Sequence, residues 1–221
     1  MTQPKSNCLI VLSAAIEGVD CQSFIQAFTL THSTFSVQLA SPNGRLSEFI
    51  NQDDSSRRWL NDFRAKSFST PINLEMVDAN RYSALLLPSM PGSVFDLAHN
   101  LELSQIIRHF VKEKKPICAV GMGVAALCCA QHDDSTWAFS SYSLTSTSVF
   151  ELARQHDFST IPIIPEDFIK DSGGKYSCSE PDAVHVVIDR HLITGQNEQS
   201  TLTAVQNLIL LCNQRQGKGV K

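Results

Sequence analysis

Short, almost wholly apolar runs alternate along the chain with segments in which apolar residues recur every three or four positions. Cys8–Leu12, Ala84–Pro88 and Pro116–Val120 are runs of the first kind, which is typical of strands buried on both faces of a parallel sheet. The spacing between the second and third runs predicts an amphipathic helix with an apolar face formed by Leu103, Ile106, Ile107, Phe110 and Val111. This alternation predicts βα units around a mostly parallel sheet.

The same patterns predict the elements on either side of this centre. Near the N-terminus we expect a helix marked by Phe24, Ile25 and Phe28, then a strand at Phe35–Ala40 closed by a turn at Pro42–Gly44. Toward the C-terminus we expect a helix at Glu166–Asp171 that Gly173 and Gly174 end, and strands at Val184–Ile188 and Leu192–Thr194 around a turn. We expect a final helix with one apolar face formed by Leu202, Val205, Leu208, Ile209 and Cys212.

Residues 45–70 are more polar and less regular than the rest of the chain. Only the piece around Trp59, Leu60 and Phe63 has amphipathic spacing. Because this segment is too short to bury a core of its own, we predict an insertion at 45–70 within a single domain that spans residues 1–221.

Composition limits the classes of function. The 221 residues carry a formal net charge of −4, which disfavours direct nucleic-acid binding because phosphate backbones attract basic surfaces. The seven cysteines include no CxxC pair and mostly lie in apolar runs, as the buried thiols of a reducing compartment do. We find no signal-peptide pattern and no apolar segment of membrane-spanning length. We therefore expect a cytoplasmic protein without direct membrane insertion.

The central apolar run ends in a glycine-rich turn. Pro116–Val120 leads directly into Gly121–Gly123, and small residues predict a helix at Val124–Ala130. A strand that breaks into a helix in this way has the geometry of a nucleophile elbow, in which the residue at the apex has a strained backbone and projects above the sheet. The pattern is weak evidence by itself, because anion-binding turns share it.

Neighbouring motifs make this pattern specific. The segment Lys115–Leu127 resembles the elbow of PfpI-type proteins in the class I glutamine amidotransferase-like superfamily, which carry Cys-His-Gly after the strand. Tyr82–Pro88 and Ser89–Gly92 resemble the family's strand and oxyanion loop, and further matches lie at 95–97, 166–173, 185–189 and 192–197. This resemblance covers almost the whole chain. It implies an α/β fold, a three-layer flavodoxin-like sandwich with a mostly parallel sheet and helices on both faces.

The sequence departs from the family at the elbow itself. Gly121 stands at the position of the nucleophilic cysteine, and Met122 stands at that of the adjacent histidine. Glycine supplies no nucleophile and methionine takes no proton near neutral pH, so the resemblance implies a pseudoenzyme with no catalytic residues. We call the remaining positions around the elbow the vestigial pocket: Glu17, Asp20, Ser89, Met90, Gly92, Gly121 and Met122.

The acidic turn after the first strand matches the family's supporting acid at Asp20. Without a thiol to contact, we expect the carboxylates of Glu17 and Asp20 to be solvated or to cap the helix that starts near Cys21. The glycines around the elbow also make a small anion a candidate ligand, because amides at a helix start favour negative charge.

An enzyme is the alternative: a cysteine hydrolase or glyoxalase-like enzyme with a relocated nucleophile. Cys178, Asp182 and His185 have the residue types of a nucleophile, an acid and a base, although the strand pattern favours a local hydrogen bond for His185. We expect no cofactor. We also expect no metal site, because His185, Asp189 and His191 lack a fourth ligand and two of them fall in a predicted turn.

The resemblance also implies partners. It implies self-association as a dimer or tetramer, and a place as a subunit of the FERRY complex. That assembly is a cytoplasmic effector of an early-endosomal Rab GTPase and links early endosomes to mRNA transport. The chain would reach the early endosome through these protein partners.

Overall fold

A computed structural model describes residues 5–218 of the chain. Its centre is a seven-stranded sheet with the order β10-β11-β7-β6-β1-β3-β5, in which β10 is antiparallel to β11 and all other neighbours are parallel. The strands of this sheet are β1 (Asn7–Val11), β3 (Ser36–Ser41), β5 (Ile72–Asn73), β6 (Ala84–Leu87), β7 (Ile117–Val120), β10 (Val186–Asp189) and β11 (Leu192–Gly195). Two small sheets pair β2 (Val19–Asp20) with β4 (Phe49–Ile50), and β8 (Ser143–Leu144) with β9 (Lys175–Tyr176).

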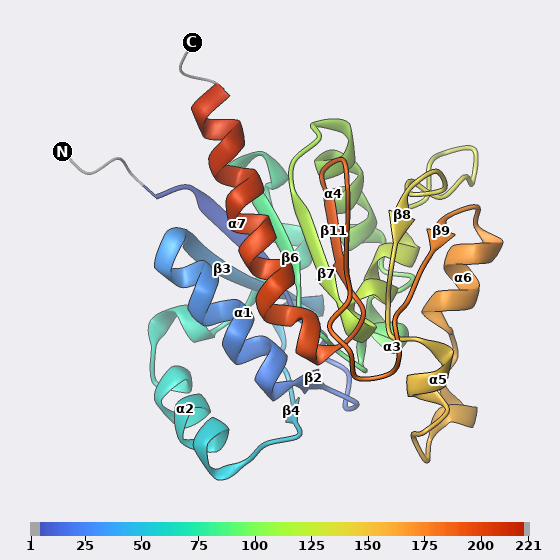
Figure 1. The fold of residues 1–221 in the computed structure, drawn as a ribbon. Helices are drawn as coiled ribbons and strands as arrows, with labels where there is room; N and C mark the ends of the chain where they lie inside the picture. The colour runs from blue at the N-terminus through green and yellow to red at the C-terminus, as the bar shows by residue number, and fades with distance from the viewer. Residues whose placement is uncertain (1–4, 219–221) are drawn as a thin grey trace.

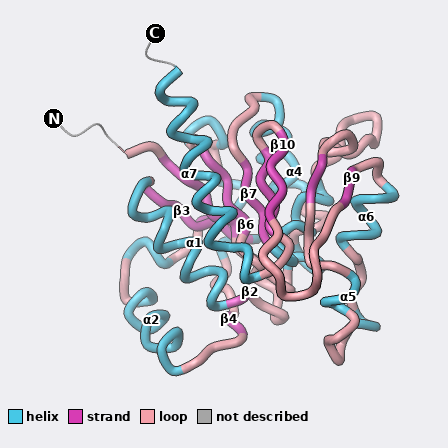
Figure 2. The backbone as a smooth tube through the Cα atoms, viewed as in Figure 1, coloured by secondary structure: helices cyan, strands magenta, loops and turns pink. Residues whose placement is uncertain are grey.

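Helices lie on both faces of the central sheet (Figure 1). The α-helices are α1 (Cys21–Thr34), α2 (Asp54–Arg64), α3 (Ser93–Asp96), α4 (Leu101–Lys112), α5 (Val149–Leu152), α6 (Pro165–Asp171) and α7 (Thr201–Lys218). Helices α1 and α7 pack together over one face, while α4 lies behind the sheet (Figure 2). The predicted three-layer α/β sandwich is confirmed. No helix within residues 5–218 is long and apolar enough to cross a membrane.

The innermost strands are buried along their whole lengths. Every residue of β6 and β7, and all of β1 from Cys8 onward, is fully buried, as their apolar sequences predict. Because these strands are parallel and in register, their carboxyl ends meet at one edge of the sheet. The loops that follow β1, β6, β7 and β11 therefore gather in one place, which is where ligands bind in sheets of this kind.

The hairpin of β10 and β11 forms one edge of the sheet. The predicted turn is confirmed between Asp189 and Leu192, and Arg190 there adopts φ 58°. Strand β10 begins two residues later than the predicted Val184, whose side chain is 55% exposed.

The helix that follows β7 is tighter than predicted. Residues Gly121–Cys129 form a 3-10 helix instead of an α-helix. A side chain at Gly123 would collide with the backbone of Leu87 and Pro88, so this segment lies directly against the end of β6. A 3-10 helix has a smaller cross-section than an α-helix, which suits this close approach.

The segment 45–70 contains an ordered helix, α2. Its Trp59 and Phe63 pack against Phe24 and Phe28 of α1, with ring centroids 5.0–6.1 Å apart. Asp53 and Ser56 form a capping box at the start of α2. The amphipathic piece found in the sequence is therefore a helix that extends the layer of α1.

The apolar face of α7 differs from the prediction at one residue. Leu202 is 45% exposed, whereas Ala204, Val205, Leu208 and Cys212 are buried. The buried stripe begins at Thr201, whose hydroxyl contacts Ser23 of α1 at 2.9 Å, and this contact turns Leu202 toward solvent.

Candidate functional site

A cavity of about 980 Å³ opens where the loops at the carboxyl edge of the sheet gather. Its walls come from the turn before α1, the segment around α5, and residues 197–199 after β11. Met122, next to the elbow apex, lies at its base together with Val94. This is the position that the elbow pattern predicts for a site.

The apex of the elbow has the expected backbone but no space for a side chain. Gly121 adopts φ 55°, a conformation that L-amino acids other than glycine rarely adopt. A Cβ atom added there would overlap the Ser89 hydroxyl and would lie 2.9 Å from Ser89 Cβ. The side chain of Ser89 therefore fills the volume that the nucleophile's side chain would need.

Ser89 is held in this place by Glu198. Its hydroxyl donates to Glu198 Oε1 at 2.6 Å, and the backbone amide of Met122 lies 3.4 Å from the same hydroxyl oxygen. Burial raises the pKa of the Glu198 carboxyl, and the hydrogen bond from Ser89 opposes that shift. Ser89 itself is fully buried, so a substrate in the cavity has no access to its hydroxyl.

Met122 lies in a small apolar cluster. It is 4% exposed and packs with Val94, Ala125 and Leu152. Ser93 donates its hydroxyl hydrogen to the Met122 carbonyl at 2.5 Å, which fixes this turn to α3. The thioether fills this position with an apolar group that carries no proton near neutral pH.

The residues of the vestigial pocket fall into three groups in the structure: those that line the cavity, those beneath Glu198, and those packed away from the cavity. Glu17, Asp20 and Met122 line the cavity, and Ser89 and Gly121 lie beneath Glu198 at its base. Met90 is fully buried in the core, where its sulfur accepts a hydrogen bond from the Ser13 amide at 3.2 Å. Gly92 packs against Ser13 and donates its amide to the Gly18 carbonyl at 3.0 Å.

Asp20 caps α1, as the sequence predicts. Its Oδ1 accepts from the Ser23 amide at 2.8 Å, and its Oδ2 accepts from Asn51 Nδ2 at 2.9 Å. Both carboxylate oxygens are thus engaged in structure, and the residue is 4% exposed. Glu17 is half-buried at the mouth of the cavity, and its carboxylate has no partner within residues 5–218.

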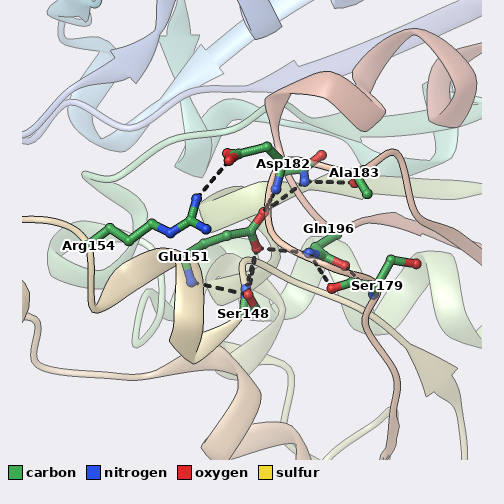
Figure 3. Close-up of polar contacts among 8 residues, drawn as sticks. Ser148, Glu151, Arg154, Ser179, Asp182, Ala183 and Gln196 are labelled. Atoms are coloured by element: carbon green, nitrogen blue, oxygen red, sulfur yellow. Dashed lines mark hydrogen bonds and ion pairs between the residues drawn. The ribbon is translucent and has the colours of Figure 1, made fainter.

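Glu151 is a buried carboxylate in the cavity lining that the sequence pattern did not reveal as a site residue. Figure 3 shows the hydrogen bonds that it accepts. Glu151 accepts hydrogen bonds from Gln196 at 3.0 Å and Asn197 at 2.8 Å, from the Asp182 amide at 3.0 Å, and from Ser148. Burial alone would raise the pKa of Glu151, but these hydrogen bonds lower it below its usual value. The signal available in the sequence was the capping box Ser148-x-x-Glu151.

The candidate relocated triad does not assemble. His185 bonds to Ser177 at 3.1 Å and to Ser179 at 2.9 Å, so the predicted local hydrogen bond is confirmed. Asp182 pairs with Arg154 at 2.7 Å, and Cys178 is exposed, with no hydrogen bond to His185 among the described residues. Burial raises the pKa of Cys118 far above its usual value, as expected for a thiol in the central strand.

The geometry gives little support for a metal ion or a small anion as a ligand. Within residues 5–218, no three His, Cys, Asp or Glu side chains are placed to hold a metal ion. A small anion above Gly121 would lie beside the Glu198 carboxylate, and the Met122 amide already faces the Ser89 hydroxyl. The electrostatics therefore oppose the anion considered from the sequence.

Solved structures share this fold at low sequence identity. A Francisella tularensis protein described as Rapid Encystment Protein 24 KDa matches with a TM-score of 0.83 and 19% identity over 94% of this chain and 99% of its own. Glyoxalase III from Candida albicans matches with a TM-score of 0.83 and 16% identity over 93% and 96%. Drosophila melanogaster DJ-1beta matches with a TM-score of 0.63 and 16% identity over 98% and 97%. These likenesses show that the chain has the three-layer α/β fold of class I glutamine amidotransferase-like domains.

Curated relatives specify the family further. Glutamine amidotransferase-like class 1 domain-containing protein 1 of Xenopus laevis is 54% identical over 96% of this chain and 92% of its own length. The Homo sapiens protein of the same name is 54% identical over 94% of each chain. No protein-family model matches the chain. The chain belongs to the family of glutamine amidotransferase-like class 1 domain-containing protein 1.

Proposed function

We propose that the chain is a catalytically inactive PfpI-type domain that acts as a self-associating assembly subunit. The observation that carries this proposal is the filled apex: Gly121 has no side chain, and Ser89 occupies the space that a nucleophile would need. Met122 removes the second catalytic group, and Asp20 is engaged as a helix cap. An elbow without nucleophile or base retains only what binding can contribute to a reaction rate.

The proposed setting is the FERRY complex, in which this subunit, as a homotetramer, would belong to a cytoplasmic Rab effector linking early endosomes to mRNA transport. The resemblance of the chain to its family supports this setting, as does the net charge of −4, which leaves RNA contact to other subunits. Purification of the tagged chain from cells should recover the other subunits of the complex. Recovery of the chain alone, under conditions that preserve a known Rab effector complex, would contradict the proposal.

Restoration of the elbow tests the inactivity. We expect the Cys178→Ser chain, which lacks the one thiol that is exposed within residues 5–218, to show no fast, stoichiometric alkylation by iodoacetamide near neutral pH. Ser89→Gly, Gly121→Cys and Met122→His together should produce a reactive thiol at position 121. The matched control carries Gly121→Ser in place of Gly121→Cys and should stay unreactive.

The alternative, an enzyme with a relocated nucleophile, is tested by turnover assays on the natural chain, which keeps Cys178. Turnover of an ester, amide or aldehyde by the natural chain, abolished by Cys178→Ser, would support that alternative and exclude the pseudoenzyme. Turnover abolished by Glu198→Gln or Met122→Ala would place the activity at the cavity. This result would also exclude the pseudoenzyme.

A further inference from the structure

The cavity beside the elbow carries charge of predominantly one sign. Its charged lining residues, besides Arg154 and His156, are six carboxylic acids: Glu17, Asp20, Glu151, Asp157, Asp182 and Glu198. Arg154 already pairs with one of these, Asp182, at 2.7 Å. The formal charge of these six acids and Arg154 is −5, which is at least as negative as the net charge of −4 of the whole chain, so the cavity is a local concentration of negative charge.

Two of these carboxylates are available to a ligand. The side chains of Glu17 and Asp157 have no hydrogen bond or ion pair within residues 5–218. The other four have partners in the protein: Asp20 caps α1, Glu151 holds the network of Figure 3, Asp182 pairs with Arg154, and Glu198 accepts from Ser89. Unpaired acids at the mouth and paired acids at the base together favour a cation over water or an anion.

An unpartnered hydroxyl in the cavity lining gives an independent indication of a ligand-binding position. Thr147 lines the same cavity and is only 6% exposed, yet its Oγ1 has no hydrogen-bond partner among the described residues. Leaving a buried hydroxyl without a partner costs free energy, so such groups are usually satisfied by protein, water or ligand. A ligand N–H group at this position would complete the hydrogen bonding of Thr147.

The rest of the lining suits an aliphatic chain. Val94, Phe95, Met122 and Ile161 line the cavity, and Phe95 is 48% exposed although it is a large aromatic residue. Apolar walls around a few polar groups are typical of small-ligand sites, and an aromatic face stabilises a nearby cation. The cavity thus combines contacts for a hydrocarbon stem with acceptors for a positive head.

We propose that this cavity binds a guanidinium or ammonium group carried on an aliphatic chain. Two sources supply that chemistry: a free amine of the agmatine type, or the arginine side chain of a protein segment. Both place the cation among the acids at Glu17 and Asp157, with an N–H group donating to Thr147. The inference rests on the cavity alone and holds whether or not the elbow is inactive.

Calorimetric titration of the full chain with three probes tests the proposal and separates the sources. The probes are agmatine, a capped Gly-Arg-Gly peptide, and the same peptide with citrulline, which has nearly the shape of arginine without its charge. Binding of agmatine with a weaker peptide indicates a free amine, and the reverse order indicates a protein segment. Citrulline binding as tight as arginine binding would overturn the proposal, and so would the absence of binding by both cations up to about 10 mM.

Variants locate the bound cation. Glu17→Gln with Asp157→Asn should weaken binding of the preferred cation about tenfold, because charge-assisted hydrogen bonds are lost. Glu113→Gln removes one carboxylate at the opposite end of the sheet, shortly before β7 begins, and should leave binding unchanged. Equal weakening by both variants would assign the effect to overall charge and overturn the site.

Thr147→Val separates ligand contact from structural damage. This change keeps the side-chain shape and removes the unpartnered hydroxyl, so the thermal stability of the unliganded chain should not fall. The same variant should weaken cation binding several-fold. Unchanged binding together with unchanged stability would show that Thr147 faces no ligand and would contradict the proposed pose.

Discussion

At the scale of single residues, the elbow depends on a pair that lies far apart in the sequence. Gly121 has the strained backbone that the strand-turn-helix pattern predicts, and this much could be inferred from the sequence. The occupation of the neighbouring space by Ser89 could not, because it depends on Glu198, 109 residues further along the chain, accepting the serine hydroxyl. Local patterns contain no information on such a contact.

A side chain at position 121 should be costly in the natural background. We expect Gly121→Ala to lower the free energy of unfolding by about 2–4 kcal/mol, because it combines a positive φ with overlap against Ser89. Ser89→Gly in the same chain should recover about 1 kcal/mol or more relative to additivity, measured by urea denaturation. Gly173→Ala is the control, since Gly173 has φ 83° but lies far from Ser89; rescue of both variants by Ser89→Gly would contradict the overlap.

His191 should make the fold sensitive to mild acid. Burial, with the charges of Arg190 and Arg215 nearby, lowers the pKa of His191 to about 4. Since the unfolded chain binds this proton near pH 6.5, the free energy of unfolding should fall as pH drops from about 6.5 to about 4, by up to about 3 kcal/mol. Denaturant titrations of His191→Leu should show a flatter profile in this window.

The carboxylates affect stability at a lower pH than His191 does, so the two contributions can be measured separately. Hydrogen bonds outweigh burial at Glu151 and Glu166 and lower their pKa values, so their contribution is lost only as pH falls below about 4.3. His132→Gln changes an exposed histidine and serves as the control. An equal loss of stability between pH 6.5 and 4.5 in His191→Leu and the natural chain would show that another group is responsible.

At the scale of elements, periodicity predicted the long helices and the buried strands but not the short pieces around the site. Helix α4 has the apolar face expected from Leu103 to Phe110, because a helix of three turns repeats its pattern several times. Helix α5 has only four residues, so its hydrophobic pattern carries no period, and its capping box was its only local signal. The wall of the cavity that it forms was therefore missed.

Glu151 should decide whether this wall is ordered. We expect Glu151→Ala to lower the free energy of unfolding by about 2–4 kcal/mol, because it leaves the buried amides of Gln196 and Asn197 without their acceptor. Hydrogen exchange in α5 should accelerate more than in α4. Phe150→Ser is the control, because that neighbouring side chain is 70% exposed; an equal effect of the two variants would contradict the role of the network.

At the scale of the whole molecule, the family and the fold follow from motifs spread over the chain, whereas the proposed assembly leaves no such pattern. Several large apolar side chains are exposed on the described surface, among them Ile16 at 83% and Leu46 at 71%. Exposed apolar area of this kind is available for contacts between copies or with partners. A contact of this kind depends on a second surface as well, so it leaves no pattern in a single sequence.

Self-association is measurable directly. Native mass measurement of the purified full chain at micromolar concentration should give a dimer or a tetramer, with the mass decreasing on dilution if the contacts are weak. A strict monomer across the concentration series would remove the main support for a self-associating assembly subunit.

The contact between Ser89 and the bare apex also makes a thiol at position 121 difficult to acquire by single substitutions. A thiol reintroduced at position 121 alone would meet the serine, and a serine lost first would leave Glu198 partly buried without its donor. Each of these single substitutions is therefore disfavoured by loss of stability in the chain as it stands. The effect of a substitution at either position thus depends on the residue at the other, so Ser89 and Gly121 are epistatic.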